Sequence, residues 1–244
     1  MKAVLVAGAA GGIGQAIVRA LLASGDVRVF AQSRSRERLE TLRERLDPGV
    51  RGRLTQIVGD AGDFDGAAEI AAEVEAAGGI DAAIAILGRG FWESGPLLAL
   101  PPDEWRAVLD EMLTAHFAFA RAIVPLLAQR RNGLYLSLGG SAAFEPARDA
   151  GLMSIAAAGQ AMLTRVLDRE RGAAGPRILE LVVEGDVATP ESEQRADPAW
   201  ISADDVGGVV AELVQYGDTT WQPKRVSDPL LVMQRMRRAL RESV

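Results

Sequence analysis

The stretch VLVAGAAGGIG, residues 4–14, decides the expected fold, because it joins a short apolar run to a helical pattern through a glycine-rich turn. Gly8, Gly12 and Gly14 stand directly after the apolar run and at the start of that helical pattern. A pyrophosphate bound at a helix N-terminus must approach the main-chain N–H groups closely, and side chains here would block it. The preceding strand and following helix favour a dinucleotide-binding turn over one that only packs the helix.

The rest of the chain alternates short apolar runs with longer amphipathic segments. Strands are predicted at 2–7, 27–32, 53–58, 81–87, 134–138 and 178–183, and helices at 12–24, 35–46, 63–77, 103–130, 152–171 and 203–215. Apolar strands separated by helices are typical of a parallel sheet covered on both faces. We therefore expect an α/β protein, a single Rossmann-type domain over 1–244 with one doubly wound parallel sheet and helices on both faces. The stretch 230–244 predicts a last amphipathic helix with a basic outer face.

The composition excludes several classes of partner. The net charge of −6 argues against nucleic acid and anionic membranes as binding partners. No apolar run approaches the roughly 18 residues of a membrane span, so we expect a cytoplasmic protein. The chain has no cysteine and one histidine, His116, which argues against disulfides and against a metal site. We expect His116 to be packed in the core or in a subunit interface.

The end of the second predicted strand bears on the choice of cofactor. An Asp or Glu at this point would bond a ribose 2′-hydroxyl and repel a 2′-phosphate. The chain has Ser33 and Arg34 instead, a hydroxyl and a guanidinium suited to a phosphate. NADP(H) is therefore favoured over NAD(H). Arg36 and Arg38 are expected on the solvated face of the next helix, among glutamates.

With these motifs, the chain resembles the short-chain dehydrogenase/reductase superfamily almost from end to end. The glycine turn, the pair Gly59–Asp60, the long helix 103–127 and the segment ELVVEGDVATP (180–190) carry the resemblance. It implies a cofactor site made of Gly8, Gly12, Ile13, Gly14, Ser33, Arg34, Asp60, Ala61, Gly88 and Thr189. It also implies a homo-oligomer, a dimer or tetramer, built through the helices at 103–130 and 152–171.

The chain departs from this superfamily at all four catalytic positions. The family uses an Asn, a Ser, a Tyr and a Lys, and the Tyr protonates the carbonyl oxygen as hydride arrives. The aligned residues here are Met112, Gly140, Met153 and Ala157. The family's catalytic roles therefore cannot be carried over to these residues.

A shift of one residue would bring two serines into the pattern. Ser141 and Ser154 would then take the Ser and Tyr positions, but Ala158 would replace the lysine, and an unassisted serine is a poor acid. No catalytic residue is assigned, and Ser137 and Ser141 remain candidates to bond a substrate.

The chain also resembles an atypical branch of the superfamily, the angucyclinone ketoreductases, which lack the Tyr–Lys pair and use NADPH on polycyclic aromatic polyketides. This implies reduction of an aromatic ketone by direct hydride transfer, with protonation assisted by the substrate or by water. Phe91 and Trp92 are candidate walls of the substrate pocket, and 189–202 is a candidate lid that carries Trp200. The alternatives are a non-catalytic NADP(H)-binding regulatory or scaffold protein, and a non-redox cyclase on the same fold.

Overall fold

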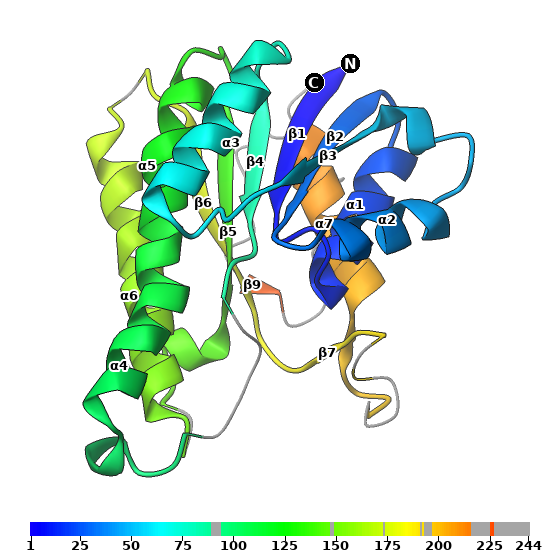
Figure 1. The fold of residues 1–244 in the computed structure, drawn as a ribbon. Coiled ribbons are helices and arrows are strands. Elements are labelled where there is room, and N and C mark those ends of the chain that lie inside the picture. The colour runs from blue at the N-terminus through cyan, green and yellow to red at the C-terminus, as the bar shows by residue number, and fades with distance from the viewer. Residues whose placement is uncertain are drawn as a thin grey trace, which may run out of the picture.

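The computed structural model of the protein describes residues 1–88, 94–146, 149–172, 174–190, 192, 197–215 and 225–226. Within this part of the chain, seven strands form one parallel sheet in the order β3-β2-β1-β4-β5-β6-β9 (Figure 1). The strands are β1 (Lys2–Ala7), β2 (Val27–Ser33), β3 (Leu54–Val58), β4 (Ala82–Ala85), β5 (Leu134–Gly140), β6 (Arg177–Val183) and β9 (Arg225–Val226). The predicted doubly wound α/β class is confirmed, and β9 extends the sheet beyond the six predicted strands.

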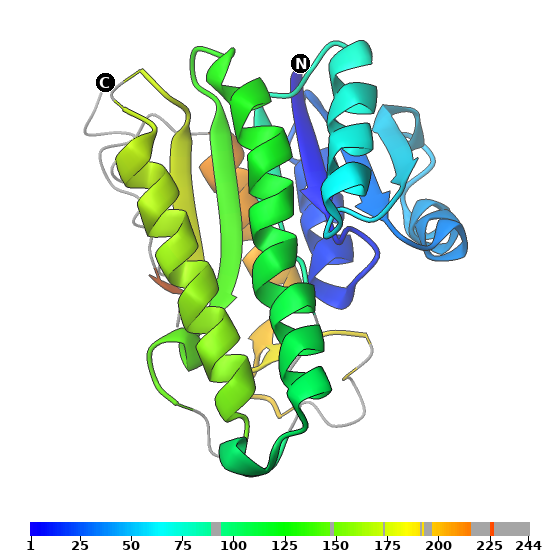
Figure 2. The same cartoon turned by 60° about the vertical axis from the view of Figure 1, so that its left-hand side comes forward.

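Helices cover both faces of the sheet (Figures 1 and 2). They are α1 (Gly12–Ala23), α2 (Arg36–Arg45), α3 (Phe64–Ala76), α4 (Pro102–Leu109), α5 (Ala115–Ala128), α6 (Gly151–Glu170) and α7 (Ala203–Gln215). One core packs α1, α2 and α7 on the sheet, with Leu21, Leu42 and Val210 as members. The second core packs α3 and α5 on the other face, where Phe119 and Tyr135 lie fully buried.

The predicted long helix contains an irregular turn. Between α4 and α5 the chain forms a π-helical turn, Asp110–Thr114, which the sequence pattern did not predict. Such turns often lie at functional sites, and Met112 is at the middle of this one. The combined helix Pro102–Ala128 is long and apolar enough to cross a membrane. Its residues Phe119 and Ile123 are buried against the sheet instead, which identifies it as a core helix of this fold.

The segment proposed as a lid begins and ends at a small two-stranded sheet. β7 (Val187–Ala188) pairs with β8 (Ile201–Ser202), so the two ends of 189–202 are hydrogen-bonded to each other. These strands were not predicted. Of the segment between them, residues 191 and 193–196 lie outside the described part of the chain, as does the C-terminal helix predicted at 230–244.

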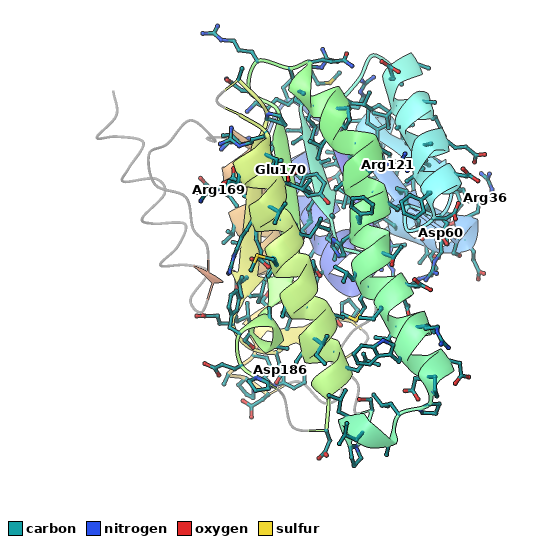
Figure 3. The ribbon with its side chains drawn as sticks, turned by 90° about the vertical axis from the view of Figure 1, so that its left-hand side faces the viewer. Arg36, Asp60, Arg121, Arg169, Glu170 and Asp186 are labelled. Atoms are coloured by element: carbon teal, nitrogen blue, oxygen red, sulfur yellow. The ribbon has the colours of Figure 1, made fainter. Side chains whose placement is uncertain are left out.

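α5 and α6 lie side by side on one face of the molecule. Figure 3 looks onto this face, with Arg121 on α5 and Glu170 at the end of α6. Gly159 of α6 packs so closely on the Leu113 side chain that an added Cβ would lie 2.9 Å from it. This contact fixes α6 against the π-helical turn and therefore against the carboxyl edge of the sheet.

Candidate functional site

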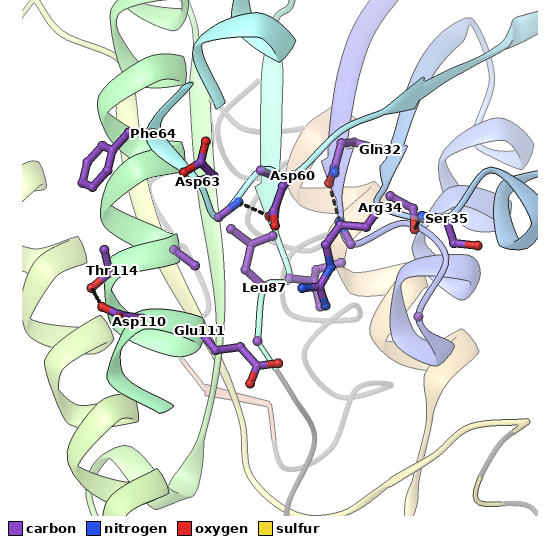
Figure 4. A pocket seen from close by; sticks show the side chains of 18 of the residues that line it. Gln32, Arg34, Ser35, Asp60, Asp63, Phe64, Leu87, Asp110, Glu111 and Thr114 are labelled. Atoms are coloured by element: carbon purple, nitrogen blue, oxygen red, sulfur yellow. Dashed lines mark hydrogen bonds between the residues drawn. The ribbon is translucent and has the colours of Figure 1, made fainter. Parts of the chain in front are cut away.

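A cavity of about 840 Å³ opens at the carboxyl ends of β1, β2 and β4. This is the edge where ligands bind in open α/β sheets, at the point where the strand order reverses. In Figure 4, Gln32, Arg34 and Ser35 approach the cavity from one side, and Phe64, Asp110 and Thr114 from the other. The structure brings six of the predicted cofactor residues to its lining, namely Gly8, Ser33, Arg34, Asp60, Ala61 and Gly88.

The glycine turn forms the floor of this cavity. Gly8 has φ +81°, and a Cβ there would overlap the Ile86 carbonyl oxygen at the end of β4. A Cβ on Gly14 would overlap the Gly8 carbonyl oxygen, so Gly14 allows α1 to pack tightly on the turn. Gly12, Ile13 and Gly14 form the first helical turn, next to Gly11, which itself lines the cavity.

The N-terminus of α1 has properties that suit an anion. The residue before the helix, Gly11, makes no side-chain cap, and the first turn carries no acidic side chain. The free N–H groups of a first turn carry a partial positive charge and need acceptors. A phosphate group placed in the cavity would supply those acceptors.

Gln32 holds the turn in place, and the sequence analysis did not single it out. It is buried at the end of β2, where its Oε1 accepts from the Gly8 N–H at 3.2 Å. Its Nε2 donates to the Gly59 carbonyl at 2.6 Å, so one side chain ties β1 to β3. A polar residue among the apolar residues of β2 was the signal available in the sequence.

The part of the cavity lined by arginines contains more residues than the predicted pair Ser33 and Arg34. Ser33, Arg34, Ser35 and Arg38 all line it. The Ser35 hydroxyl caps α2 by accepting from the Arg38 N–H at 3.2 Å, and the Ser33 hydroxyl accepts from the Ser35 N–H at 3.2 Å. The Arg38 guanidinium donates to the Ala10 carbonyl at 2.8 Å, above the glycine turn. Arg38 is exposed as predicted, but its side chain is more than a solvated helix face, because it bonds the Ala10 carbonyl and lines the cavity.

The opposite wall begins after β3. Asp60 Oδ1 accepts from the Gly62 N–H at 2.9 Å, which fixes the carboxylate at the cavity. Asp63 caps α3 by accepting from the N–H groups of Asp65 and Gly66. Both aspartates therefore shape the loop through hydrogen bonds within it, and Asp60 lines the cavity as part of the predicted cofactor site.

The end of β4 is held against the long helix. Gly88 has φ +97°, and a Cβ there would lie 3.2 Å from Met112 Cγ. One residue earlier, the Leu87 carbonyl oxygen lies 3.3 Å from His116 Nε2. His116 is 1% exposed, and burial lowers its pKa to about 4. The expectation of a packed histidine is confirmed, and the ring is neutral near pH 7.

The positions of the family's catalytic residues are apolar in three dimensions as well as in sequence. Met112 packs with Val108, Leu152 and Ala156 in a small core, and Met153 lies against it. At the end of β5, a Cβ on Gly140 would meet no atom within 4 Å. The structure therefore places open space at the family's serine position, and apolar side chains at the positions of its asparagine and tyrosine.

The two candidate serines differ in access. Ser137 is fully buried under α6, where its hydroxyl accepts from Gln160 Nε2 at 2.9 Å. Gln160 also donates to the Leu138 carbonyl at 2.7 Å. These bonds make Ser137 a core residue, so its candidacy for bonding a substrate is not supported. Ser141 is half-buried and opens a short 3₁₀ turn directly after β5.

The remaining predicted residues that the structure describes do not line the cavity. Thr189 lines a separate hollow of about 260 Å³ together with Arg19 and Asp204. Its N–H donates to the Ser192 hydroxyl at 2.9 Å, and its own hydroxyl lies 3.3 Å from the same oxygen. Trp200 is half-buried just before β8. Phe91 and Trp92 lie outside the residues that the structure describes.

Comparison with known proteins places this geometry in a family context. Residues 2–198 match the family described as short chain dehydrogenase. An uncharacterized oxidoreductase of Staphylococcus aureus is 25% identical over 229 residues, which cover 93% of this chain and 94% of the relative. The 2,3-dihydro-2,3-dihydroxybenzoate dehydrogenase of Bacillus subtilis is 27% identical over 201 residues, covering 82% of this chain and 72% of that enzyme.

Two solved structures show similar folds. A metagenomic short-chain oxidoreductase in complex with NADP is 25% identical, with a TM-score of 0.74 over 92% of this chain and 95% of its own. The NADPH-bound short chain oxidoreductase of Pseudomonas aeruginosa PAO1, described as containing an atypical catalytic center, has a TM-score of 0.80 at 21% identity. That match covers 92% of this chain and 93% of the other.

Proposed function

Because this chain belongs to the short chain dehydrogenase family, we propose that it is an NADPH-dependent ketoreductase that reduces a carbonyl of a polycyclic aromatic, angucyclinone-like substrate. The observation that carries the proposal is the cavity where the glycine turn meets two arginines and two serines. The solved relatives described as bound to NADP or NADPH support the same cofactor.

The lining residues fit NADPH part by part. The turn at Gly8 and the first turn of α1 would hold the pyrophosphate, because neither offers a side chain that would block it. Arg34 would hold the 2′-phosphate through charge-assisted hydrogen bonds, with Ser33 beside it. Asp60 would contact the adenine. The bound cofactor supplies the hydride, and the protein supplies position and a dry environment.

The apolar cluster around Met112 and Met153 supports a large hydrophobic substrate. General acid catalysis contributes about 10² to 10⁴ in rate, which is about 3–5.5 kcal/mol of activation free energy. Positioning a carbonyl against the nicotinamide can contribute more than that. A hydroxyaryl ketone or quinone whose neighbouring hydroxyl bonds its own carbonyl would tolerate the loss of the family's tyrosine.

The outer faces of α5 and α6 support a homo-oligomer. Phe117 on α5 and Ile155, Met162 and Val166 on α6 are exposed large apolar side chains. These two helices lie side by side on one face of the molecule (Figures 2 and 3). Apolar patches of this kind mark protein–protein contacts. We assign this face to a contact between copies of the chain.

Binding titrations with NADPH and NADH test the cofactor. We expect Arg34→Ala to weaken NADPH by at least about tenfold, the loss typical of a hydrogen bond to a charged group, and to leave NADH within about twofold. Arg36→Ala is the matched control, because Arg36 lies two residues away at the start of α2 and is exposed but does not line the cavity. Equal losses for the two nucleotides would refute the phosphate role of Arg34.

Turnover with a panel of polycyclic ketones tests the reaction. We expect NADPH oxidation with hydroxylated polycyclic quinones, and slower oxidation when the hydroxyl beside the carbonyl is removed. The apolar catalytic positions also suit a non-catalytic NADP(H)-binding regulator, which would bind NADPH and oxidise it with no member of the panel. Absence of NADPH binding would contradict both functions and favour a non-redox cyclase.

A further inference from the structure

A half-buried carboxyl group lies beside the end of β5, close to the family's serine position. Glu180 is on β6 and pairs in register with Ser137 of β5. Its side chain extends toward the carboxyl edge of the sheet, so that a Cβ on Gly139 would lie 2.8 Å from Glu180 Oε1. The missing side chain at Gly139 therefore makes the space that this carboxyl group fills.

The surroundings of this carboxyl group favour its protonated form. Glu180 Oε1 is buried and has no hydrogen-bond donor among the described residues. Burial raises the pKa of Glu180, and the charge of Arg165 on α6 opposes that rise. The Arg165 guanidinium lies 5.3 Å from the centre of the Phe144 ring, which holds it on this side of the sheet. A buried carboxyl oxygen without a donor favours the protonated form, because the charged form is poorly solvated there.

The carboxyl group also lies next to open space at the end of β5. Gly140 follows Gly139 directly, and a side chain at Gly140 would meet no atom within 4 Å. The nearby alternatives are poor proton donors, since Ser137 is buried and bonded to Gln160. The helix positions opposite are occupied by Met112 and its apolar neighbours.

We propose that Glu180 is the catalytic acid of this protein, giving its proton to the carbonyl oxygen of the substrate beside Gly139 and Gly140. This inference rests on the proposed reductase function. The carbonyl carbon gains the hydride of NADPH and forms a C–H bond, and the C=O electron pair moves onto oxygen. The O–H bond of Glu180 breaks and its proton joins that oxygen, so the products are the alcohol, NADP⁺ and a Glu180 carboxylate.

The same surroundings serve both stages of the transfer. Before transfer, burial raises the pKa of Glu180 and so favours its protonated form, and after transfer the positive charge of Arg165 stabilises the carboxylate that forms. Water then returns the proton when the product has left. A general acid needs this balance between holding and releasing its proton.

The test compares Glu180→Gln with Glu170→Gln. Glutamine matches glutamate in shape but cannot donate an acidic proton, and Glu170 is an exposed carboxylate at the end of α6 (Figure 3). We expect Glu180→Gln to lower turnover of a ketone without a neighbouring hydroxyl by about 10²-fold. The dissociation constant of NADPH should stay within about twofold. The loss should shrink for a substrate whose own hydroxyl bonds its carbonyl, and Glu170→Gln should change neither quantity.

A second readout needs no turnover. In an infrared titration of the free protein, the C=O stretch of one protonated carboxylic acid should persist to a higher pH than those of the exposed carboxyl groups, and Glu180→Gln should remove it while Glu170→Gln keeps it. If Glu180→Gln does not fold, Gly139→Ala provides the same test, because its Cβ would displace Oε1 while leaving the carboxyl group present. That variant should shift the infrared band and lower turnover.

The outcomes separate this inference from the function on which it rests. Wild-type turnover in Glu180→Gln, with NADPH bound normally, overturns Glu180 as the acid and leaves the reductase function standing. An infrared titration in which no carboxylic-acid band persists beyond those of the exposed carboxyl groups also overturns it. Failure of the unmodified protein to bind NADPH would instead contradict the proposed function itself.

Discussion

Lowering the pH should reduce the free energy of unfolding of this protein through the side chain of His116. The His116 ring is enclosed between α5 and the end of β4. Its Nε2 lies 3.3 Å from the Leu87 carbonyl oxygen. Its Nδ1 is buried and has no hydrogen-bond partner in the described part of the chain. A proton added to Nδ1 would place a charge in the core without an acceptor, so protonation favours the unfolded chain.

The size of the effect follows from the pKa. Burial lowers the pKa of His116 from 6.5 to about 4. Between these values the unfolded chain binds a proton that the folded chain does not, so the free energy of unfolding rises with pH. The stabilisation is fully present above pH 6.5 and declines as the pH falls toward 4. The full loss is about 3 kcal/mol, of which about 2 kcal/mol is reached near pH 5.

Urea unfolding of the unmodified protein and of His116→Gln, at pH 7.5 and at pH 5, measures this contribution. Glutamine can keep a donor near the Leu87 carbonyl but cannot titrate, so any packing cost of the substitution is the same at both pH values. We expect the unmodified protein to lose about 2 kcal/mol more than the variant on acidification.

Both proteins contain the same carboxyl groups, so the contributions of these groups to the pH dependence of stability cancel in the comparison. Glu180 acts in the opposite direction, since its raised pKa gives stability that is lost as the pH rises. Because the chain has one histidine, a single imidazole signal in ¹⁵N NMR reports the titration directly. Equal acid sensitivity of the two proteins, or a ring that titrates near its ordinary pKa of 6.5, would refute the reasoning.

Two further predictions concern the glycine turn and the outer helices. Gly14→Ala should lower the free energy of unfolding by about 1–3 kcal/mol and abolish NADPH binding, because its Cβ would overlap the Gly8 carbonyl oxygen. Gly52→Ala is the control and should have little effect in the same denaturation series, since a Cβ on Gly52 would meet no atom within 4 Å. Met162→Arg should shift the mass measured by light scattering toward the monomer, since Met162 is exposed on the apolar face of α6. Leu98→Arg, at a fully exposed residue outside α5 and α6, should leave the mass unchanged, and a monomeric unmodified protein would contradict the assignment of this face.

The amino-acid sequence by itself determined the class of the fold and the place of the cofactor site. Alternating apolar and amphipathic segments identify a parallel sheet, because each pattern reflects the local geometry of a strand or a helix. Gly8, Ser33, Arg34 and Asp60 could be placed at one edge because parallel strands all end on the same side. The short strands β7 and β9 gave no such pattern, since two residues cannot show a period.

Only the tertiary structure decided which side chains meet. Arg38 lines the cavity because Ser35 caps α2 and the guanidinium reaches Ala10, a contact between segments far apart in the sequence. Ser137 is removed from the site by Gln160, which is 23 residues away in the chain.

Glu180 gave no sign of a role in the sequence, where it is one of 33 acidic residues. Its position depends on the register of β6 against β5 and on the space at Gly139. Strand register and helix packing arise from contacts summed over the whole core, and they determine burial, hydrogen-bond partners and pKa values. The sequence could therefore locate the edge of the sheet where chemistry occurs, while the folded core determined which polar groups reach it.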